Sequence, residues 1–172
     1  MHLNLEHRIA RGAFADIFSP PPGDKVYKLF RRLVEPVFLN VEPHIFKAET
    51  AAYEIAVRHS DLRSHVPAYY GPVAITRVSG NGGSDESQQY RLDLCYAVER
   101  IDPDPEERKF GSFYNELEWH LMEPLEQLFE SAGIGHLGDA SVLHWRSGHP
   151  IVIDFAVSDA AADHAHLPPE AA

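Results

Sequence analysis

Residues 10–30, which read ARGAFADIFSPPPGDKVYKLF, decide how this chain begins to fold. Residues 14–18 and 25–30 alternate between apolar and polar side chains, which is typical of β-strands. The stretch 19–24 between them holds consecutive prolines and a glycine. It predicts a tight turn, because proline fixes φ and glycine permits positive φ. With a further alternating segment at 3–9, the pattern predicts an antiparallel meander of three strands.

The hydrophobic period changes after Pro43. Side chains then recur at spacings of three and four residues, which predicts an amphipathic helix. The members of this stripe are Ile45, Phe46, Glu49, Ala52, Tyr53, Ala56 and Val57. Further strands are predicted at 69–77 and 90–101, and the polar, glycine-rich stretch 80–89 between them predicts a flexible hairpin loop.

The C-terminal part predicts a helix and a hairpin. Apolar side chains mark one face of a helix over 116–131, which Pro124 should kink or split. Two short apolar runs, 141–145 and 150–155, are separated by turn residues and predict a β-hairpin. The order of strands, helix, strands, helix and hairpin predicts an α+β fold.

The composition limits the partners of the chain. Its length of 172 residues suits one domain or two small lobes. A formal net charge of −11 disfavours nucleic acid and anionic lipid, because both require clustered Lys and Arg. Residues 1–11 lack the apolar core of a signal peptide, and no apolar stretch has the length of a membrane span. We therefore expect no membrane contact and a cytoplasmic location, with export as an effector left open.

The single cysteine, Cys95, excludes an internal disulfide. It lies in an apolar run, where a buried thiol is expected to act as a small hydrophobe.

The N-terminal half offers three candidate features for binding. The small residues around Gly12 at a strand–turn–strand tip would let the backbone approach phosphates closely, although an ordinary hairpin turn fits as well. Lys28 either points to solvent or provides a cation for phosphate. Glu49 lies on the apolar side of the first helix, where a carboxylate is costly to bury unless it is paired. Lys28 is a suitable partner, and Glu54 is the competing acid.

Two carboxylates stand out in the C-terminal half. Asp139 follows a glycine, and Asp154 ends the apolar run Ile-Val-Ile. Strand ends are where ligand groups gather, and two carboxylates suit a magnesium ion and a hydroxyl to be activated. The alternative is that both aspartates cap turns.

These pieces, in this order, resemble the protein-kinase-like superfamily. Residues 12–17 resemble the glycine-rich loop, and Val-Tyr-Lys at 26–28 resembles the third-strand lysine motif. The resemblance implies that Gly12, Ala13 and Phe14 contact the nucleotide, that Lys28 grips its phosphates and that Glu49 holds this lysine. Residues 97–101 resemble the hinge, with Val98 as gatekeeper and the backbones of Glu99 and Ile101 at the adenine edge.

The resemblance also assigns the C-terminal acids. Asp139 would be the catalytic base, and Asp154, in Asp-Phe-Ala, would bind magnesium. His144 occupies the place of a second metal ligand, where a neutral imidazole suits magnesium poorly. Leu137 replaces the catalytic-loop histidine, and Ala156 replaces the last glycine of Asp-Phe-Gly.

The implied architecture is bilobal. Residues 1–101 would form an antiparallel β lobe with one helix, and residues 102–172 a strongly truncated helical lobe, because 16 residues follow Ala156. The implied function is ATP-dependent phosphoryl transfer, with magnesium or manganese, to a hydroxyl of a protein or small molecule. The alternatives are a pseudokinase that binds nucleotide without catalysis and an unrelated α+β domain.

Overall fold

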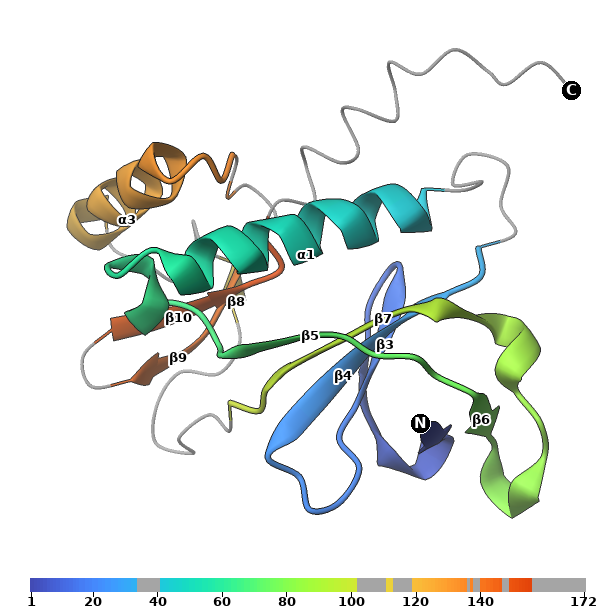
Figure 1. The fold of residues 1–172 in the computed structure, drawn as a ribbon. Coiled ribbons are helices and arrows are strands. Elements are labelled where there is room, and N and C mark those ends of the chain that lie inside the picture. The colour runs from blue at the N-terminus through green and yellow to red at the C-terminus, as the bar shows by residue number, and fades with distance from the viewer. Residues whose placement is uncertain are drawn as a thin grey trace, which may run out of the picture. The chain divides into compact units, whose positions relative to one another are not determined.

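The computed structural model describes residues 1–33, 41–101, 111–112, 119–135, 137, 140–146 and 149–155, with the backbone alone at 111–112 and 142–146. The described residues form an antiparallel β-sheet, smaller sheets and two α-helices, α1 (Glu42–Arg58) and α3 (Trp119–Ser131) (Figure 1). This arrangement confirms the predicted α+β class.

The chain divides into two compact units. Unit 1 comprises Met1–Phe46 and Pro67–Ile101, and unit 2 comprises Lys47–Val66 and Asp102–Ala172. The predicted division after residue 101 assigned Lys47–Val66 to the first lobe, whereas this segment groups with the second unit.

The main sheet of unit 1 has five strands in the order β2-β3-β4-β7-β5. Every neighbouring pair in it is antiparallel. The strands are β2 (Arg8–Arg11), β3 (Ala15–Phe18), β4 (Lys25–Arg31), β7 (Tyr90–Glu99) and β5 (Tyr69–Pro72). The predicted meander is therefore present, and the proline-rich turn joins β3 to β4.

The first predicted strand, 3–9, is interrupted. It divides into β1 (His2–Asn4), a 3₁₀ turn, η1 (Leu5–His7), and β2. The side chain of Asn4 accepts a hydrogen bond of 2.9 Å from the Glu6 N–H. This local bond caps the turn and competes with a continuous strand.

The predicted strand 69–77 is also divided, into β5 and β6 (Arg77–Ser79). Strand β6 pairs in parallel with β1, which brings Leu3 beside Val78. Both side chains enter the core of unit 1 together with Cys95. Cys95 is fully buried, which confirms the expected buried hydrophobe. Burial raises the pKa of its thiol to about 12.

Residues 80–89, the predicted loop, connect β6 to β7. The loop contains two 3₁₀ turns, η4 (Asn81–Gly83) and η5 (Ser87–Gln89). The Gly80 N–H donates to the Ser84 carbonyl, and the Glu86 N–H donates to the Val78 carbonyl, each at 2.9 Å. The first bond is internal to the loop, and the second ties the loop to β6.

Helix α1 matches the stripe predicted after Pro43. A proline is tolerated in the first turn of a helix, where its missing N–H has no intrahelical partner. In unit 1, the Phe46 ring lies 5.9 Å from that of Phe30 and 6.2 Å from that of Tyr96, so the start of the helix packs on the sheet.

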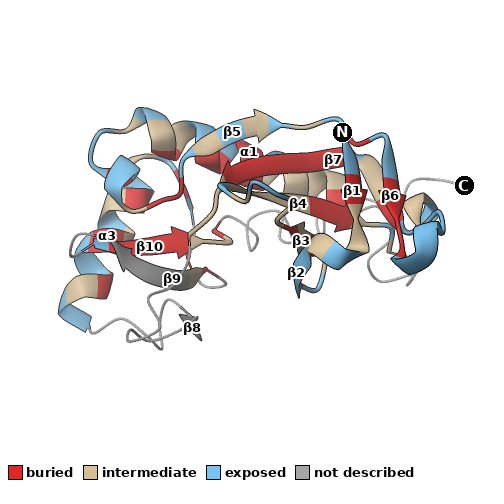
Figure 2. Cartoon of the chain, turned by 90° about the horizontal axis from the view of Figure 1, so that it is seen from below, coloured by how far each residue is buried: buried red, intermediate tan, exposed pale blue. Residues whose placement is uncertain are grey.

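Unit 2 contains the predicted C-terminal hairpin. Strands β9 (Ser141–Arg146) and β10 (His149–Ile153) pair antiparallel, and β8 (Gly111–Ser112) adds to the other edge of β9. The rings of Tyr53 and Phe129 lie 4.6 Å and 5.4 Å from the ring of Phe155, which directly follows this hairpin. Figure 2 shows most of β10, like most of β7 in unit 1, as buried.

Pro124 does not split helix α3, which was one of the two predicted outcomes. The proline lies within α3, which continues past it to Ser131. Proline removes one backbone bond, to the residue four positions earlier. The buried face of Met122, Leu125 and Phe129 holds the helix together across that gap.

Candidate functional site

The register of the unit 1 sheet determines which face of the sheet carries the Lys28 side chain. Ile17 pairs with Lys28, and Lys28 pairs with Tyr96. Val26 pairs with Val98, the predicted gatekeeper. Since alternate residues of a strand share a face, the half-buried Lys28 lies on one face of the sheet with these apolar side chains. Its Nζ is 5.8 Å from the centre of the Phe30 ring.

The predicted nucleotide loop is a turn closed by its own backbone. The Gly12 N–H donates to the Ala15 carbonyl at 2.8 Å. A Cβ on Gly12 would lie 3.3 Å from that carbonyl oxygen, so the close approach favours glycine. The placement of Gly12, Ala13 and Phe14 between β2 and β3 agrees with the predicted strand–turn–strand tip.

Arg31 holds this turn from β4. Its Nη2 donates to the Gly12 carbonyl at 2.8 Å and also to the Ala13 carbonyl. Its backbone N–H donates to the Phe14 carbonyl at 2.9 Å. The three residues predicted to contact the nucleotide, Gly12, Ala13 and Phe14, are therefore all bonded to Arg31, which the sequence analysis did not identify.

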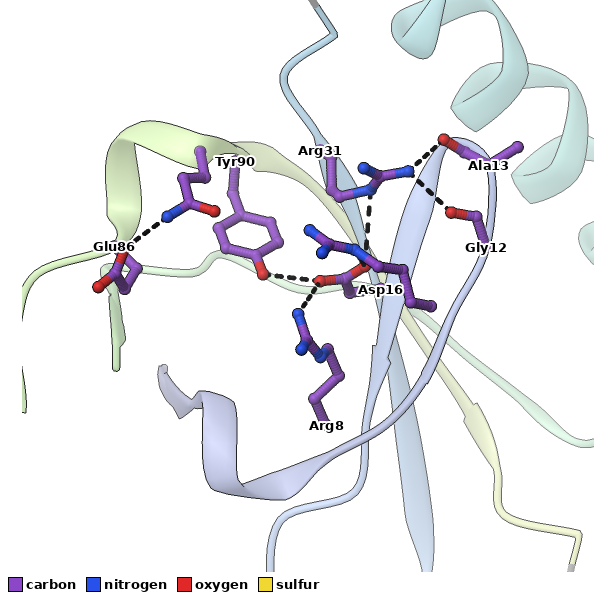
Figure 3. A network of polar contacts seen from close by, with 9 residues as sticks. Arg8, Gly12, Ala13, Asp16, Arg31, Glu86 and Tyr90 are labelled. Carbon is purple, nitrogen blue, oxygen red and sulfur yellow. Dashed lines mark hydrogen bonds and ion pairs between the residues drawn. The ribbon is translucent and has the colours of Figure 1, made fainter. Parts of the chain in front are cut away.

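Arg31 also belongs to a cluster around Asp16, which is fully buried (Figure 3). Asp16 Oδ2 accepts from Arg8 Nη1 at 3.0 Å and from the Tyr90 hydroxyl at 2.8 Å. Asp16 Oδ1 accepts from Arg11 Nε at 3.2 Å, and Arg31 Nε lies 3.5 Å away. We call these five residues the Asp16 cluster.

The electrostatics of the Asp16 cluster follow from its burial. Burial, with the hydrogen bond to Asp16, raises the pKa of Tyr90 to about 12, so the hydroxyl remains a donor. The hydrogen bond to Asp16 raises the pKa of Arg8. The only sequence signal was an acid at an alternating strand position with arginines in the flanking strands.

The predicted hinge lies at the end of β7. The Glu99 N–H donates to the Ala68 carbonyl at 2.8 Å, and the Glu99 carboxylate accepts from the Ala68 N–H at 3.1 Å. Ile101 follows, half-buried. The Glu99 N–H is therefore already bonded within unit 1.

Unit 2 carries Glu49 and Asp154. Glu49 is 1% exposed on α1, as expected for an acid on the apolar side of that helix. Asp154 follows β10, is half-buried and has a φ of +57°, the one non-glycine residue with positive φ among those described. Such left-handed conformations are uncommon outside glycine and are over-represented at functional sites.

The remaining predicted residues are only partly described. Asp139 lies outside the described residues, as does the side chain of His144, whose backbone belongs to β9. Among the side chains that the structure describes, no group of three or more His, Cys, Asp or Glu is arranged to hold a metal ion. The assignments of Asp139 and His144 therefore stay predictions.

Unit 2 also has a cavity of about 230 Å³, whose lining includes His65, His120 and His149 but none of the predicted site residues. The His65 and His149 rings lie 5.0 Å apart, and His65 Nδ1 lies 3.2 Å from the Pro150 carbonyl. Burial lowers the pKa of His65. The sequence analysis did not identify this group of histidines.

None of the described helices combines the length and apolar character needed to cross a lipid bilayer. The chain matches no model of a protein family and no curated protein sequence.

Proposed function

We propose that this chain binds ATP with Mg²⁺ or Mn²⁺ and transfers the γ-phosphoryl group to a hydroxyl of a protein or small molecule. The observation that carries the proposal is the register of the unit 1 sheet. One sheet combines the turn at Gly12, the cation of Lys28 and the strand end at Glu99, in the order that a nucleotide-binding lobe of the protein-kinase-like superfamily requires.

The proposed nucleotide lies along the face that carries Lys28. Ile17, Val26 and Val98 offer this face apolar side chains, on which a flat adenine ring packs favourably. The carbonyl of Glu99 and the backbone of Ile101 would bind the polar edge of the ring. Lys28 would then neutralise phosphate charge, which is the main electrostatic contribution to phosphoryl transfer.

The chemical step is assigned to acids of the C-terminal half and to Glu49. Glu49 is buried, and a buried carboxylate requires a charged or hydrogen-bonding partner. We propose that Lys28 provides it. Asp154, in its left-handed conformation after β10, would bind the metal, and Asp139 would accept the proton of the attacking hydroxyl.

Transfer from labelled ATP tests the proposal. The parent protein is incubated with Mg²⁺ or Mn²⁺, and incorporated label and released phosphate are measured. Asp154→Ala should lower the rate roughly a hundredfold or more, because it removes a group that acts on the transferring phosphate. Asp85→Ala, which removes an exposed acid paired with Arg77, should leave the rate unchanged. Equal rates for Asp154→Ala and the parent would contradict the proposed enzyme.

A second candidate is a module that binds nucleotide without catalysis. Leu137, at the position of the catalytic-loop histidine, is fully buried and offers no polar side-chain atom to that loop. Binding is measured separately, because a ligand that prefers the folded state raises the melting temperature. Stabilisation by ATP and metal without transfer would favour this module, and no stabilisation at millimolar ATP would contradict both functions.

A further inference from the structure

The Asp16 cluster has unequal charges. Three guanidinium groups, from Arg8, Arg11 and Arg31, surround a single carboxylate. Both carboxylate oxygens already accept contacts from these groups and from Tyr90. Asp16 therefore neutralises one of three positive charges, and the cluster keeps an excess of positive charge although the chain has a net charge of −11.

The outer arginines retain both donors and access to solvent. Arg8 contributes Nη1 and Arg11 contributes Nε to Asp16, which leaves further N–H groups on each planar guanidinium. Their side chains are 32% and 49% exposed. Across the described ranges, neither arginine has an ion pair with any acid except Asp16.

Glu86, an acid outside the cluster, forms its hydrogen bonds within its own loop. Glu86 accepts from the Ser84 hydroxyl at 2.7 Å. It also accepts from the Gln89 side chain (Figure 3). Its carboxylate is thus bonded within residues 84–89, so it leaves the excess charge of the cluster in place.

We propose that Arg8 and Arg11 form a binding site for a phosphate group, free or as a monoester. Guanidinium groups present coplanar N–H donors that match phosphate oxygens, and such charge-assisted hydrogen bonds are among the stronger ones in proteins. A phosphate dianion would also balance the two excess charges. Asp16 positions both arginines, because it binds one nitrogen of each and leaves their other nitrogens available to a ligand.

This site lies on the face of the sheet opposite Lys28. Asp16 pairs with Leu29, whereas the next residue, Ile17, pairs with Lys28. Successive side chains of a strand point to opposite faces, so the Asp16 cluster is separated from the proposed nucleotide face by the sheet. The phosphate site is therefore distinct from the proposed ATP site.

The two faces are nonetheless connected through Arg31. This residue contacts Asp16 and also holds the carbonyls of Gly12 and Ala13. A phosphate bound to Arg8 and Arg11 would change the charge balance that holds Arg31 against the turn. The site thus connects an anionic effector to the loop indirectly, through Arg31.

Thermal unfolding tests the site with inorganic phosphate and, in parallel, O-phosphoserine, each replacing chloride at constant ionic strength. The proteins are the parent, Arg11→Gln, Arg77→Gln and Lys28→Met. Arg77 is a matched control in unit 1, because its side chain is 47% exposed and pairs with Asp85. Arg8→Gln provides a second cluster variant if Arg11→Gln does not fold.

Either probe should raise the melting temperature of the parent, Arg77→Gln and Lys28→Met in a saturable way. Arg11→Gln should raise the dissociation constant about tenfold or more, because a charge-assisted contact is lost. The stronger probe identifies free or esterified phosphate as the better ligand. No shift in the parent, or equal shifts in Arg11→Gln and Arg77→Gln, would overturn the proposal. Loss of the shift in Lys28→Met with retention in Arg11→Gln would also overturn it, because phosphate would then bind the other face.

Discussion

Among single residues, Asp16 combines complete burial with four polar contacts. A buried carboxylate is tolerated only when charge and hydrogen bonds replace its lost hydration. Arg8, Arg11 and Arg31 supply the charge, and Tyr90 supplies a neutral donor. The same contacts keep three cations close together, so the stability of the cluster depends on one negative charge.

Asp16→Asn should therefore destabilise the protein by about 3 kcal/mol, as is typical when one partner of a buried ion pair is removed. The free energy of unfolding is obtained from urea denaturation at neutral pH. The loss should shrink at high salt, which screens the repulsion among the half-exposed arginines. In Asp85→Asn the altered carboxylate is 61% exposed and 3.9 Å from Arg77, and little change is expected. Equal losses in both variants would contradict the role of the cluster.

Among the structural elements, the β2–β3 turn depends on β4. Three carbonyls of the turn accept hydrogen bonds from the side chain or backbone of Arg31. The turn has one glycine, Gly12, whereas the glycine-rich loop that it resembles has three. Bonds from a neighbouring strand thus restrain a loop whose own sequence already allows less backbone freedom.

Arg31→Met should release this turn, because methionine keeps an unbranched apolar stem but donates no hydrogen bond. Amide hydrogen exchange at residues 12–15 should become roughly tenfold faster relative to exchange in β7, since bonds to a charged donor are lost. Arg32→Met changes the adjacent, exposed arginine and should leave exchange in the turn unaltered. The same ratio of turn to β7 exchange in both variants would show that Arg31 does not restrain the turn.

For the whole molecule, the proposed function requires side chains from both units to act on one nucleotide. Lys28 belongs to unit 1, whereas Glu49 and Asp154 belong to unit 2. Glu49 is buried and Lys28 half-buried. If they form the proposed ion pair, removal of one partner leaves the other in an unfavourable environment, and the effects of the two removals are not additive.

A double-mutant cycle with Lys28→Met and Glu49→Gln measures this coupling. The free energies of unfolding should show an interaction of about 1–3 kcal/mol, typical of groups in direct contact. The control cycle replaces Glu49→Gln with Glu54→Gln, the competing acid on α1, which is exposed and pairs with Arg58. Its coupling to Lys28 should be close to zero. Similar coupling in both cycles would refute the specific Lys28–Glu49 pair and leave the phosphate site unaffected.

Local patterns in the sequence were sufficient for most of the elements. The alternation in 14–30, the helical stripe after Pro43 and the apolar runs that form β9 and β10 all appear in the structure. The burial of Cys95 was predicted as well. These features follow from periodicity and from the fixed φ of proline. Both act over a few residues, so they can be recognised within a single segment of the sequence.

The tertiary structure decided the features that depend on distant segments. Three interactions join residues far apart in the chain. They are the parallel pairing of β1 with β6, the hydrogen bond of Tyr90 to Asp16 and the hydrogen bonds of Arg31 to the β2–β3 turn. The hydrophobic periodicity of a segment does not determine which other strand it pairs with. Asp16 appeared in the sequence as an ordinary strand residue, and its burial became favourable only when three arginines and a tyrosine converged on it, because a carboxylate leaves water only where new partners replace its hydration.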